Sequence, residues 1–477
     1  MVLIDEKRKA RNPVRSGYLF FIFLVLLGAN PWVVRWFLAP VGPMPAPVLG
    51  GVVVHFLMWA VLAVAVFRSR GERPWMRGIL WAAGFYLSVL FFIGIDRLAG
   101  RWVNVPGNPL FSGFIFPPDT EVRYETSEFR FVAQTNDWGI RDRNYKLGKD
   151  TCFRILVLGD SNTFGWGIDA SETYENQLQN RLRESGICAR VFNFGQPGGF
   201  TLHYKKNLAR AIDFVRPDLV VVGLLQSDDL RQSVEAAERR QGVSPTRLYL
   251  KAALYYCLKN FKRLYECKTN IDKNPPEKIR ETWQKEVAQI KAAFTARQRE
   301  KYLKTDPAFR QLLEAGAINA YLVRAVLSDT LDHWRVNFPE NPAVRRGFFD
   351  FREDLRELKK ITRSHGADLL LLNIPYCPYF SRNALIYKEL HCFEEPVLLS
   401  LNRVDSMYQA AADFAGAPMV HFTDWFKVED PRRKLYFHYD GHLTPEAHRM
   451  LGDSIARYLI PRYFDAFIQP DEAKKEK

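Results

Sequence analysis

The sequence lacks the motifs by which proteins bind metals and nucleic acids. The 477-residue chain has six cysteines and nine histidines, but no CxxC pair and no Cys/His spacing typical of zinc. It has no helix-turn-helix, zinc finger or aromatic-basic RNA motif, and its basic residues are dispersed in spite of a net charge of +14. We therefore expect no metal, no other cofactor and no nucleic acid partner, and we interpret the charge as basic membrane flanks and a solvated basic face.

Charge is scarce in the first hundred residues, which contain three long apolar runs at 17–38, 46–67 and 78–95. A helix needs about 20 apolar residues to cross a bilayer, so the second and third runs are predicted to span. The first is interrupted by Asn30, Pro31 and Arg35. It either crosses with Arg35 reaching toward an interface, or forms a short span followed by an interfacial helix.

Loop charges predict the orientation of these spans. Basic residues precede the first run and separate the second from the third, whereas residues 39–47 carry no charge. The positive-inside rule then places the N-terminus and the second connection in the cytoplasm. Three crossings put everything after about Asp96 outside, and two would leave it in the cytoplasm. The lipid bilayer is an expected partner in either case.

All the cysteines lie in the C-terminal part of the chain. In an exported domain an even number of cysteines permits disulfides. Cys152 and Cys188 precede two predicted neighbouring strands at matching places, so a bridge between them is expected, with six free buried thiols as the alternative.

Strand-like and helix-like segments alternate after residue 150. Such alternation predicts an α/β fold with a parallel sheet between two helical layers. The predicted strands are 153–158, 189–193, 218–225, 368–374 and 419–422. The predicted parts are a membrane region (1–101), a lead-in with a short strand or hairpin (102–150), the α/β domain (151–466) and a charged tail (467–477).

A long helical insertion, 231–346, separates the third and fourth predicted strands, with 277–302 as its longest helical run. An insertion at this edge is often a lid or substrate-binding cap. A helical subdomain with no role in the site is the alternative.

The segment ILVLGDSNTFGWG, residues 155–167, contains the leading nucleophile candidate. A buried strand ends at Gly159-Asp160-Ser161, and a helix is predicted soon after it. A serine on such a turn projects its hydroxyl from the carboxyl edge of a sheet, where α/β proteins bind ligands. Ser161 is therefore the predicted nucleophile.

A serine needs a base that accepts its proton. His442 lies in a loop directly before the last predicted helix, which begins with Thr444 as N-cap and Pro445 as first residue. Asp440, two residues earlier, can orient the imidazole and stabilise its protonated form. His448 falls on the helix itself and is expected to pack or face solvent. Ser161, His442 and Asp440 form the predicted catalytic set.

Two further turns follow strands at the same predicted edge. The turn from Asn193 to Gly199 is rich in glycine, which lets a backbone approach a ligand closely. The turn from Gln226 to Asp229 carries polar side chains that can donate hydrogen bonds or position a substrate. Together with the backbone N–H of Ser161, these groups can stabilise an oxyanion.

The combination of these motifs resembles the SGNH/GDSL hydrolase superfamily. Gly159-Asp160-Ser161 matches its first block, Asn193 through Gly198 with Thr201 its second, and Asp440 with His442 its last. The lead-in TNDWGIRD is similar to that of membrane-anchored bacterial members. The resemblance covers about residues 131–459 without the insertion. It implies a three-layer α/β/α flavodoxin-like fold, Gly198 as an oxyanion donor, and Asn193 as part of the substrate-binding edge.

The chain departs from the family pattern at two places. The third block normally reads Gly-x-Asn-Asp, with the asparagine as an oxyanion donor. A gapless count puts Ser227 and Asp228 at the last two positions, and a shift of one residue puts Asp228 and Asp229 there. Loss of such a donor commonly costs about 10²–10³ in turnover. Asp440 and His442 also follow the spacing Asp-x-His, which related envelope-glycan acetyltransferases share.

The predicted function is that of a membrane-anchored serine esterase or O-acyltransferase. The resemblance implies acetyl or similar esters of an envelope polysaccharide or lipid as substrate. It also implies the bacterial inner membrane as location, with the main domain on the periplasmic or extracellular side. One alternative is a degenerate envelope protein that binds glycan or scaffolds an assembly. Another is a transferase that depends on a membrane-bound acyl donor as partner.

Overall fold

The computed structural model describes residues 74–108, 113–145, 151–241, 275–320, 335–381 and 402–464, short stretches between 19 and 68, and residues 111, 258, 260 and 384. The chain divides into two compact units. One comprises residues 1–111 and 244–266, and the other comprises 112–243 and 267–477. The predicted 467–477 tail and the lead-in residues 146–150 lie outside the described residues.

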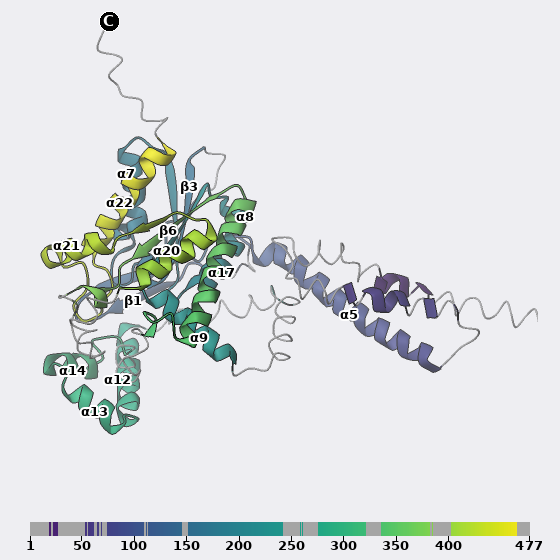
Figure 1. Cartoon of the computed structure of the whole chain (residues 1–477), viewed down its shortest axis with the longest axis horizontal. Coiled ribbons are helices and arrows are strands. Elements are labelled where there is room, and N and C mark those ends of the chain that lie inside the picture. Colours follow the sequence, from purple (N-terminus) through teal and green to yellow (C-terminus); the bar gives the residue numbers. More distant parts are fainter. Residues whose placement is uncertain are drawn as a thin grey trace, which may run out of the picture. The chain divides into compact units, whose positions relative to one another are not determined.

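A five-stranded parallel sheet forms the centre of the larger unit (Figure 1). Its order is β4-β3-β5-β6-β7. Gly159 at the end of β3 pairs with Gly195, the end of β4, and with Gly223 of β5, which continues two residues further to Leu225. The strands are β3 (Phe153–Gly159), β4 (Ala189–Gly195), β5 (Leu219–Leu225), β6 (Asp368–Ile374) and β7 (Met419–His421).

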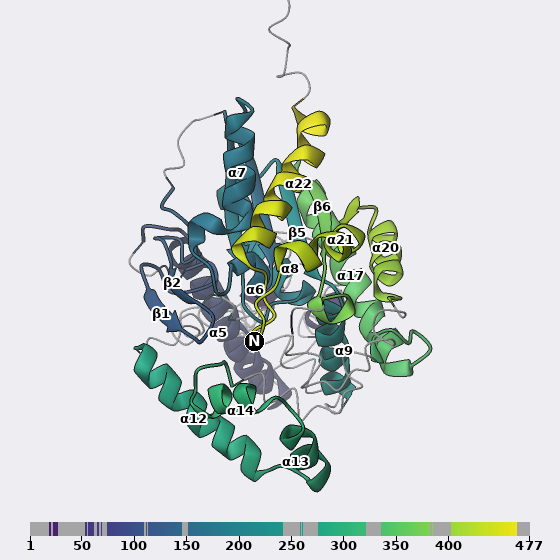
Figure 2. The same cartoon turned by 90° about the vertical axis from the view of Figure 1, so that its left-hand side faces the viewer.

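Helices cover both faces of the sheet, which confirms the predicted α/β class. The chain passes from β3 through α7 to β4 on one side, and then through α8 to β5 on the other side of β3. Because crossovers between parallel strands are right-handed, the two opposite directions place α7 and α8 on opposite faces of the sheet. Figures 1 and 2 show α22 beside α7, and α17 beside α8. The sheet's helices are α6 (Ser161–Phe164), α7 (Tyr174–Glu184), α8 (Thr201–Val215), α9 (Asp228–Gln241), α17 (Pro342–Ser364), α20 (Val404–Ala415), α21 (Thr423–Arg433) and α22 (Pro445–Tyr463).

All five predicted strands are present, and each boundary is within two residues of the prediction. The prediction of one long helical run at 277–302 is wrong, because α12 (Pro276–Ala292) and α13 (Ala296–Leu303) are separate helices. Thr295 starts the second with a capping box in which its side chain and that of Gln298 each bind the other's backbone N–H. A third helix, α14 (Pro307–Glu314), packs with them around a small apolar core (Figure 2).

An antiparallel hairpin of β1 (Glu121–Glu125) and β2 (Arg130–Gln134) precedes the sheet. It confirms the strand or hairpin predicted for the lead-in. Alternate residues of β2 are buried, among them Phe131 and Ala133, because one face of the hairpin packs on the unit and the other faces solvent. The hairpin therefore belongs to the domain that carries the site.

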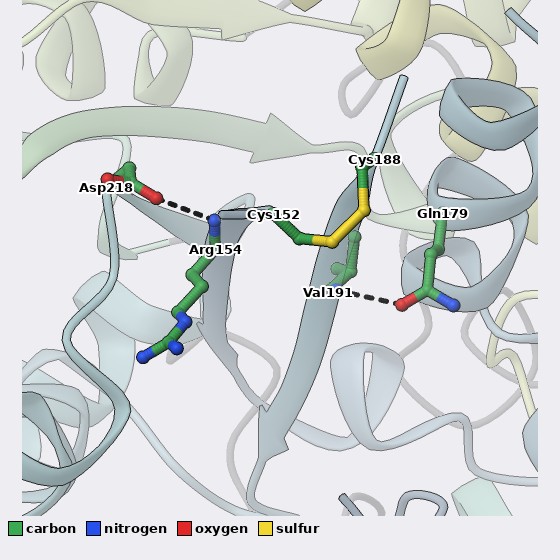
Figure 3. The surroundings of a disulfide bond; sticks show 6 residues. All are labelled: Cys152, Arg154, Gln179, Cys188, Val191 and Asp218. Carbon is green, nitrogen blue, oxygen red and sulfur yellow. Dashed lines mark hydrogen bonds between the residues drawn. A yellow bond between two sulfur atoms is a disulfide. The ribbon is translucent and has the colours of Figure 1, made fainter. Parts of the chain in front are cut away.

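Cys152 and Cys188 form a disulfide at the amino ends of β3 and β4 (Figure 3). The predicted bridge is thus confirmed. The neighbouring strand ends are fixed by Asp218, which accepts from the Arg154 N–H at 2.7 Å, and by Gln179, which accepts from the Val191 N–H at 3.0 Å. Cys377 is a buried free thiol, and Cys257, Cys267 and Cys392 lie outside the described residues.

Helix α5 (Pro74–Val103) is the main described element of the smaller unit. Its segment Ala82–Gly100 is long and apolar enough to cross a bilayer, and no other described helix meets that criterion. It contains most of the third predicted span. The first two predicted spans lie largely outside the described residues, but Ile22, Val25 and Trp59 from these runs form a buried cluster with α5.

The carboxyl-terminal half of α5 binds a segment from the insertion. The buried Asp96 side chain accepts from the Asn260 backbone N–H at 3.0 Å and from its amide group at 3.1 Å. Gly100 allows this approach, because a Cβ there would meet the Asn260 amide at 2.6 Å. Part of the predicted insertion therefore belongs to the smaller unit.

Candidate active site

The turn from β3 into α6 places Ser161 at the carboxyl edge of the sheet. Asp160 caps α6 by accepting from the Asn162 N–H at 2.9 Å. Gly159 is required at the strand end, since a Cβ there would overlap the Thr163 hydroxyl at 1.9 Å. The sheet order reverses beside this strand, the usual position of ligand sites in such sheets.

Ser161 is hydrogen-bonded to His442, and His442 to Asp440. The distance from Ser161 Oγ to His442 Nε2 is 2.8 Å, and His442 Nδ1 contacts Asp440 Oδ1 directly. With the ring proton on Nδ1, the serine hydroxyl donates to Nε2 and Nδ1–H donates to the carboxylate. The structure thus brings together all three residues predicted for catalysis, one from the end of β3 and two from a loop far from it in sequence.

The His442 loop is anchored next to the serine turn. The Leu443 N–H donates to the Asn162 side-chain oxygen at 3.3 Å, and α22 begins at Pro445 as predicted. His448 is buried on α22, where its Nδ1 accepts from the Tyr174 N–H at 3.1 Å. Burial lowers the pKa of His448 to about 3, so it is a neutral packing residue.

Carboxylates surround the imidazole and shift its pKa. Burial alone would lower the pKa of His442, but the negative charges of Asp440, Asp160 and Asp228 together raise it above the ordinary value. Burial, followed by the charge of Asp228, raises the pKa of Asp160 to about 6. The site therefore favours a protonated imidazole, the state that a general base reaches during catalysis.

Two backbone N–H groups are placed to stabilise an oxyanion. The Ser161 N–H lies at the start of α6, and Gly198 lies in the turn after β4 with φ of +68°. Within the described part of the chain, neither N–H has a hydrogen-bond acceptor. The space into which a Gly198 Cβ would project is empty to 4 Å. Both groups are thus available to a ligand.

Asn193 lies on β4, two residues before the strand ends at Gly195. Its side-chain amide donates to the Thr163 carbonyl at 2.8 Å, and its side-chain oxygen accepts from the Gly195 N–H at 2.9 Å. The residue is buried, and both ends of its amide are used within the protein. Asn193 therefore joins the β4 turn to α6, rather than facing a substrate as predicted.

The polar residues of the third turn, Ser227, Asp228 and Asp229, differ in their burial and contacts. Ser227 is fully buried with φ of +71°. Asp229 is also buried and accepts from the Leu225 N–H at 2.7 Å, which closes the turn. Asp228 is the residue whose charge acts on His442 and Asp160. Ser227 and Asp229 are thus enclosed by the protein, whereas Asp228 is only partly buried.

Asp228 is held by two side chains from its own helix. Arg231 Nη2 donates to Oδ1 at 2.6 Å, and Gln232 Nε2 donates to Oδ2 at 2.6 Å. A carboxylate has no proton to donate when ionised. Asp228 therefore presents hydrogen-bond acceptors, and no donor, at this turn.

Arg141 is a supporting residue that sequence reasoning did not identify. Its buried guanidinium donates to the carbonyls of Phe164 at 2.8 Å and Gly165 at 2.7 Å, where α6 ends. Burial lowers its pKa to about 10, at which it stays charged near neutral pH. The only sequence signal was its place in the TNDWGIRD lead-in.

Trp166 is an aromatic neighbour of His442 that was also missed. Its ring centroid lies 6.1 Å from that of His442, and it packs on Tyr124 at 4.9 Å and Phe131 at 5.4 Å. The ring is partly exposed. It follows the nucleophile turn directly in the sequence, which was the available signal.

The chain matches no protein-family model and no curated protein sequence. About 65% of it aligns with solved SGNH/GDSL lipolytic hydrolases. TesA is 15% identical with a TM-score of 0.32 over 65% of this chain and 98% of TesA. A lipase/acylhydrolase from Enterococcus faecalis is 12% identical with a TM-score of 0.32 over 65% of this chain and 96% of its own. AlinE4, an SGNH-hydrolase family esterase, is 15% identical with a TM-score of 0.29 over 66% of this chain and 99% of its own. Likeness at this level carries no argument about chemistry, so the site itself must supply it.

Proposed function

We propose that this chain is a serine-dependent ester hydrolase or O-acyltransferase. The observation that carries the proposal is the hydrogen-bonded series from Asp440 through His442 to Ser161. A nucleophile, a base within 3 Å and a third group that orients the base are the parts that acyl transfer needs. The two backbone N–H groups of Ser161 and Gly198 supply the oxyanion site.

The chemistry divides into two displacements. The Ser161 oxygen attacks the ester carbonyl while its proton passes to His442 Nε2, and the resulting oxyanion is held by the N–H groups of Ser161 and Gly198. The C–O bond to the alcohol then breaks, and the alcohol leaves with the proton from His442. Water or a second hydroxyl attacks the acyl-enzyme by the same steps in reverse, which regenerates the serine.

The membrane is the proposed location. Helix α5 carries exposed apolar side chains along a segment long enough to cross a bilayer, including Phe85, Phe91 and Phe92. The Cys152–Cys188 disulfide is typical of proteins in oxidising compartments. Both observations support a domain held at the outer face of the bacterial inner membrane. Substrates there would be acetyl or similar esters of envelope polysaccharide or lipid, with a membrane-bound acyl donor as a partner if the enzyme is a transferase.

One observation favours a second candidate function. The family resemblance puts Ser227 or Asp228 at the position of the usual oxyanion donor, and a carboxylate there would oppose negative charge on the substrate oxygen. This favours an envelope protein that binds glycan or scaffolds an assembly without turnover. The intact Ser161, His442 and Asp440 set favours catalysis instead.

Turnover of an aryl acetate by the detergent-solubilised full chain tests the proposal. We expect measurable turnover that Ser161→Ala abolishes. Ser171→Ala is the matched control, because Ser171 is an exposed serine on the short helix Ala170–Glu172. No difference between Ser161→Ala and this control would contradict the proposal.

A further inference from the structure

The loop that carries Asp440 and His442 is held by a side chain from the lead-in hairpin. Glu128 lies between β1 and β2, 312 positions before Asp440. Its Oε2 atom accepts from the Asp440 N–H at 2.7 Å and from the Tyr439 N–H at 3.0 Å. The His438 N–H also favours its ionised form. Two successive backbone N–H groups of the loop thus donate to one carboxylate.

This placement brings two carboxylates, those of Glu128 and Asp440, close together. Burial raises the pKa of Glu128, and the charge of Asp440 raises it further, while the backbone N–H groups lower it. A partly buried carboxylate beside another carboxylate is unfavourable unless hydrogen bonds compensate it. Here the compensating bonds come from the backbone that positions Asp440. The partly buried charge of Glu128 is therefore stabilised only while the loop keeps this geometry.

The helical insertion contacts both the loop of Asp440 and the hairpin turn of Glu128. Tyr439 packs against the apolar core of α12–α14, with its ring 5.9 Å from that of Phe309. The Ala317 carbonyl accepts from the Ser127 N–H at 2.8 Å. The residues next to Glu128 and next to Asp440 are therefore both fixed by the insertion.

We infer that Glu128 is a positioning residue for the Asp440–His442 pair, and that α12–α14 brace this contact. The inference rests on the proposed function, because the pair matters for turnover only if His442 is the base. Glu128 touches no reacting atom. It fixes the backbone of Asp440 so that the carboxylate meets His442 Nδ1, and a misplacement of about 1 Å in such a group can cost about 10² in rate.

Three variants of Glu128 test this role in the detergent-solubilised full chain. Glu128→Ala removes both acceptor bonds, and we expect kcat for an aryl acetate to fall about 10- to 100-fold with little change in KM. Glu128→Asp is too short to reach both N–H groups and should also lose most of kcat. Glu128→Gln keeps an oxygen acceptor and should restore kcat to within about threefold of wild type. Glu121→Ala is the matched control, an exposed glutamate of the same hairpin whose side chain binds Arg123.

The pH profile distinguishes positioning from general stability. Asp440 raises the pKa of His442, so a displaced Asp440 lowers that pKa. The acid limb of kcat should then move to lower pH in Glu128→Ala and Glu128→Asp, and stay in place in Glu128→Gln and in the control. A wild-type kcat and acid limb in Glu128→Ala would overturn the inference. If Glu128→Ala does not fold, Glu128→Asp decides in the same way.

A failure of the proposed function would give a different result from a failure of the Glu128 inference, because it would already be seen in the wild-type chain. If the wild-type chain neither turns over the ester nor reacts with a fluorophosphonate, the proposed function is wrong. Glu128 is then tested by proton NMR of the Asp440–His442 hydrogen bond. The strongly deshielded Nδ1 proton should be present in wild type and Glu128→Gln and lost in Glu128→Ala. Its retention in Glu128→Ala would overturn the positioning role independently of activity.

Discussion

Against the lowering effect of burial, Asp228 adds to the effects of Asp440 and Asp160 in raising the pKa of His442. One residue thus has two opposing effects on the proposed reaction. It favours the protonated imidazole that forms when Ser161 loses its proton, and it disfavours negative charge on the substrate oxygen. Because Arg231 and Gln232 occupy both carboxylate oxygens, the group is fixed in this place.

Replacing Asp228 with asparagine should increase hydrolysis. In the proposed site the amide supplies an oxyanion donor at this position, and one such donor commonly changes turnover by about 10²–10³. We expect kcat of Asp228→Asn on an aryl acetate to rise at least about tenfold, since part of the gain is offset by the lost charge near His442. Glu235→Gln is the control, because Glu235 also pairs with Arg231 but lies about two turns further along α9 than Asp228. A kcat that falls, or rises equally in both variants, would contradict the role given to Asp228.

The pH dependence of turnover should follow the raised pKa of His442. The base must be neutral to accept the serine proton, so kcat/KM rises with pH as His442 loses its proton. Since Asp440, Asp160 and Asp228 raise its pKa, the midpoint should lie above the ordinary histidine value of about 6.5. In Asp440→Asn it should move to lower pH, and kcat should fall by about 10⁴ as the tautomer is lost. A wild-type midpoint below the ordinary value would show that another group controls the reaction.

Arg141→Lys should destabilise the nucleophile turn. The guanidinium donates to four carbonyls, those of Phe164, Gly165, Ile168 and Val132, and an ammonium cannot reach them all. We expect a loss of about 2–4 kcal/mol in the free energy of unfolding and slower fluorophosphonate labelling, measured by denaturant titration and by labelling rate. Arg143→Lys, at an arginine with 41% side-chain exposure, should cost less than about 0.5 kcal/mol. Equal losses in both variants would contradict this account of Arg141.

The sheet could be predicted from sequence because its strands are short apolar runs between turn signals. The run 219–225 is buried at every position, as expected for a parallel strand covered on both faces. Helix ends were harder to predict. The break between α12 and α13 depends on the local capping bonds of Thr295 and Gln298, which hydrophobic periodicity does not show.

The meeting of Ser161, His442 and Asp440 could be predicted, because each follows a strand or precedes a helix with a clear boundary. The supporting residues could not. Glu128 and Arg141 act on backbone groups far away in sequence, and no spacing rule connects a side chain to a remote N–H or carbonyl. Asn193 shows the same limit, since its neighbours indicate a ligand edge but its amide binds the protein.

The most direct test of the central claim is covalent labelling of the full chain with a fluorophosphonate, followed by mass spectrometry of its peptides. Only an activated serine reacts with this probe at an appreciable rate. The account predicts one adduct on the peptide that contains Ser161, absent in Ser161→Ala and strongly slowed in His442→Ala, while Ser171→Ala labels like wild type. No adduct on Ser161, or labelling unchanged in His442→Ala, would contradict a Ser161–His442–Asp440 acyl-transfer centre.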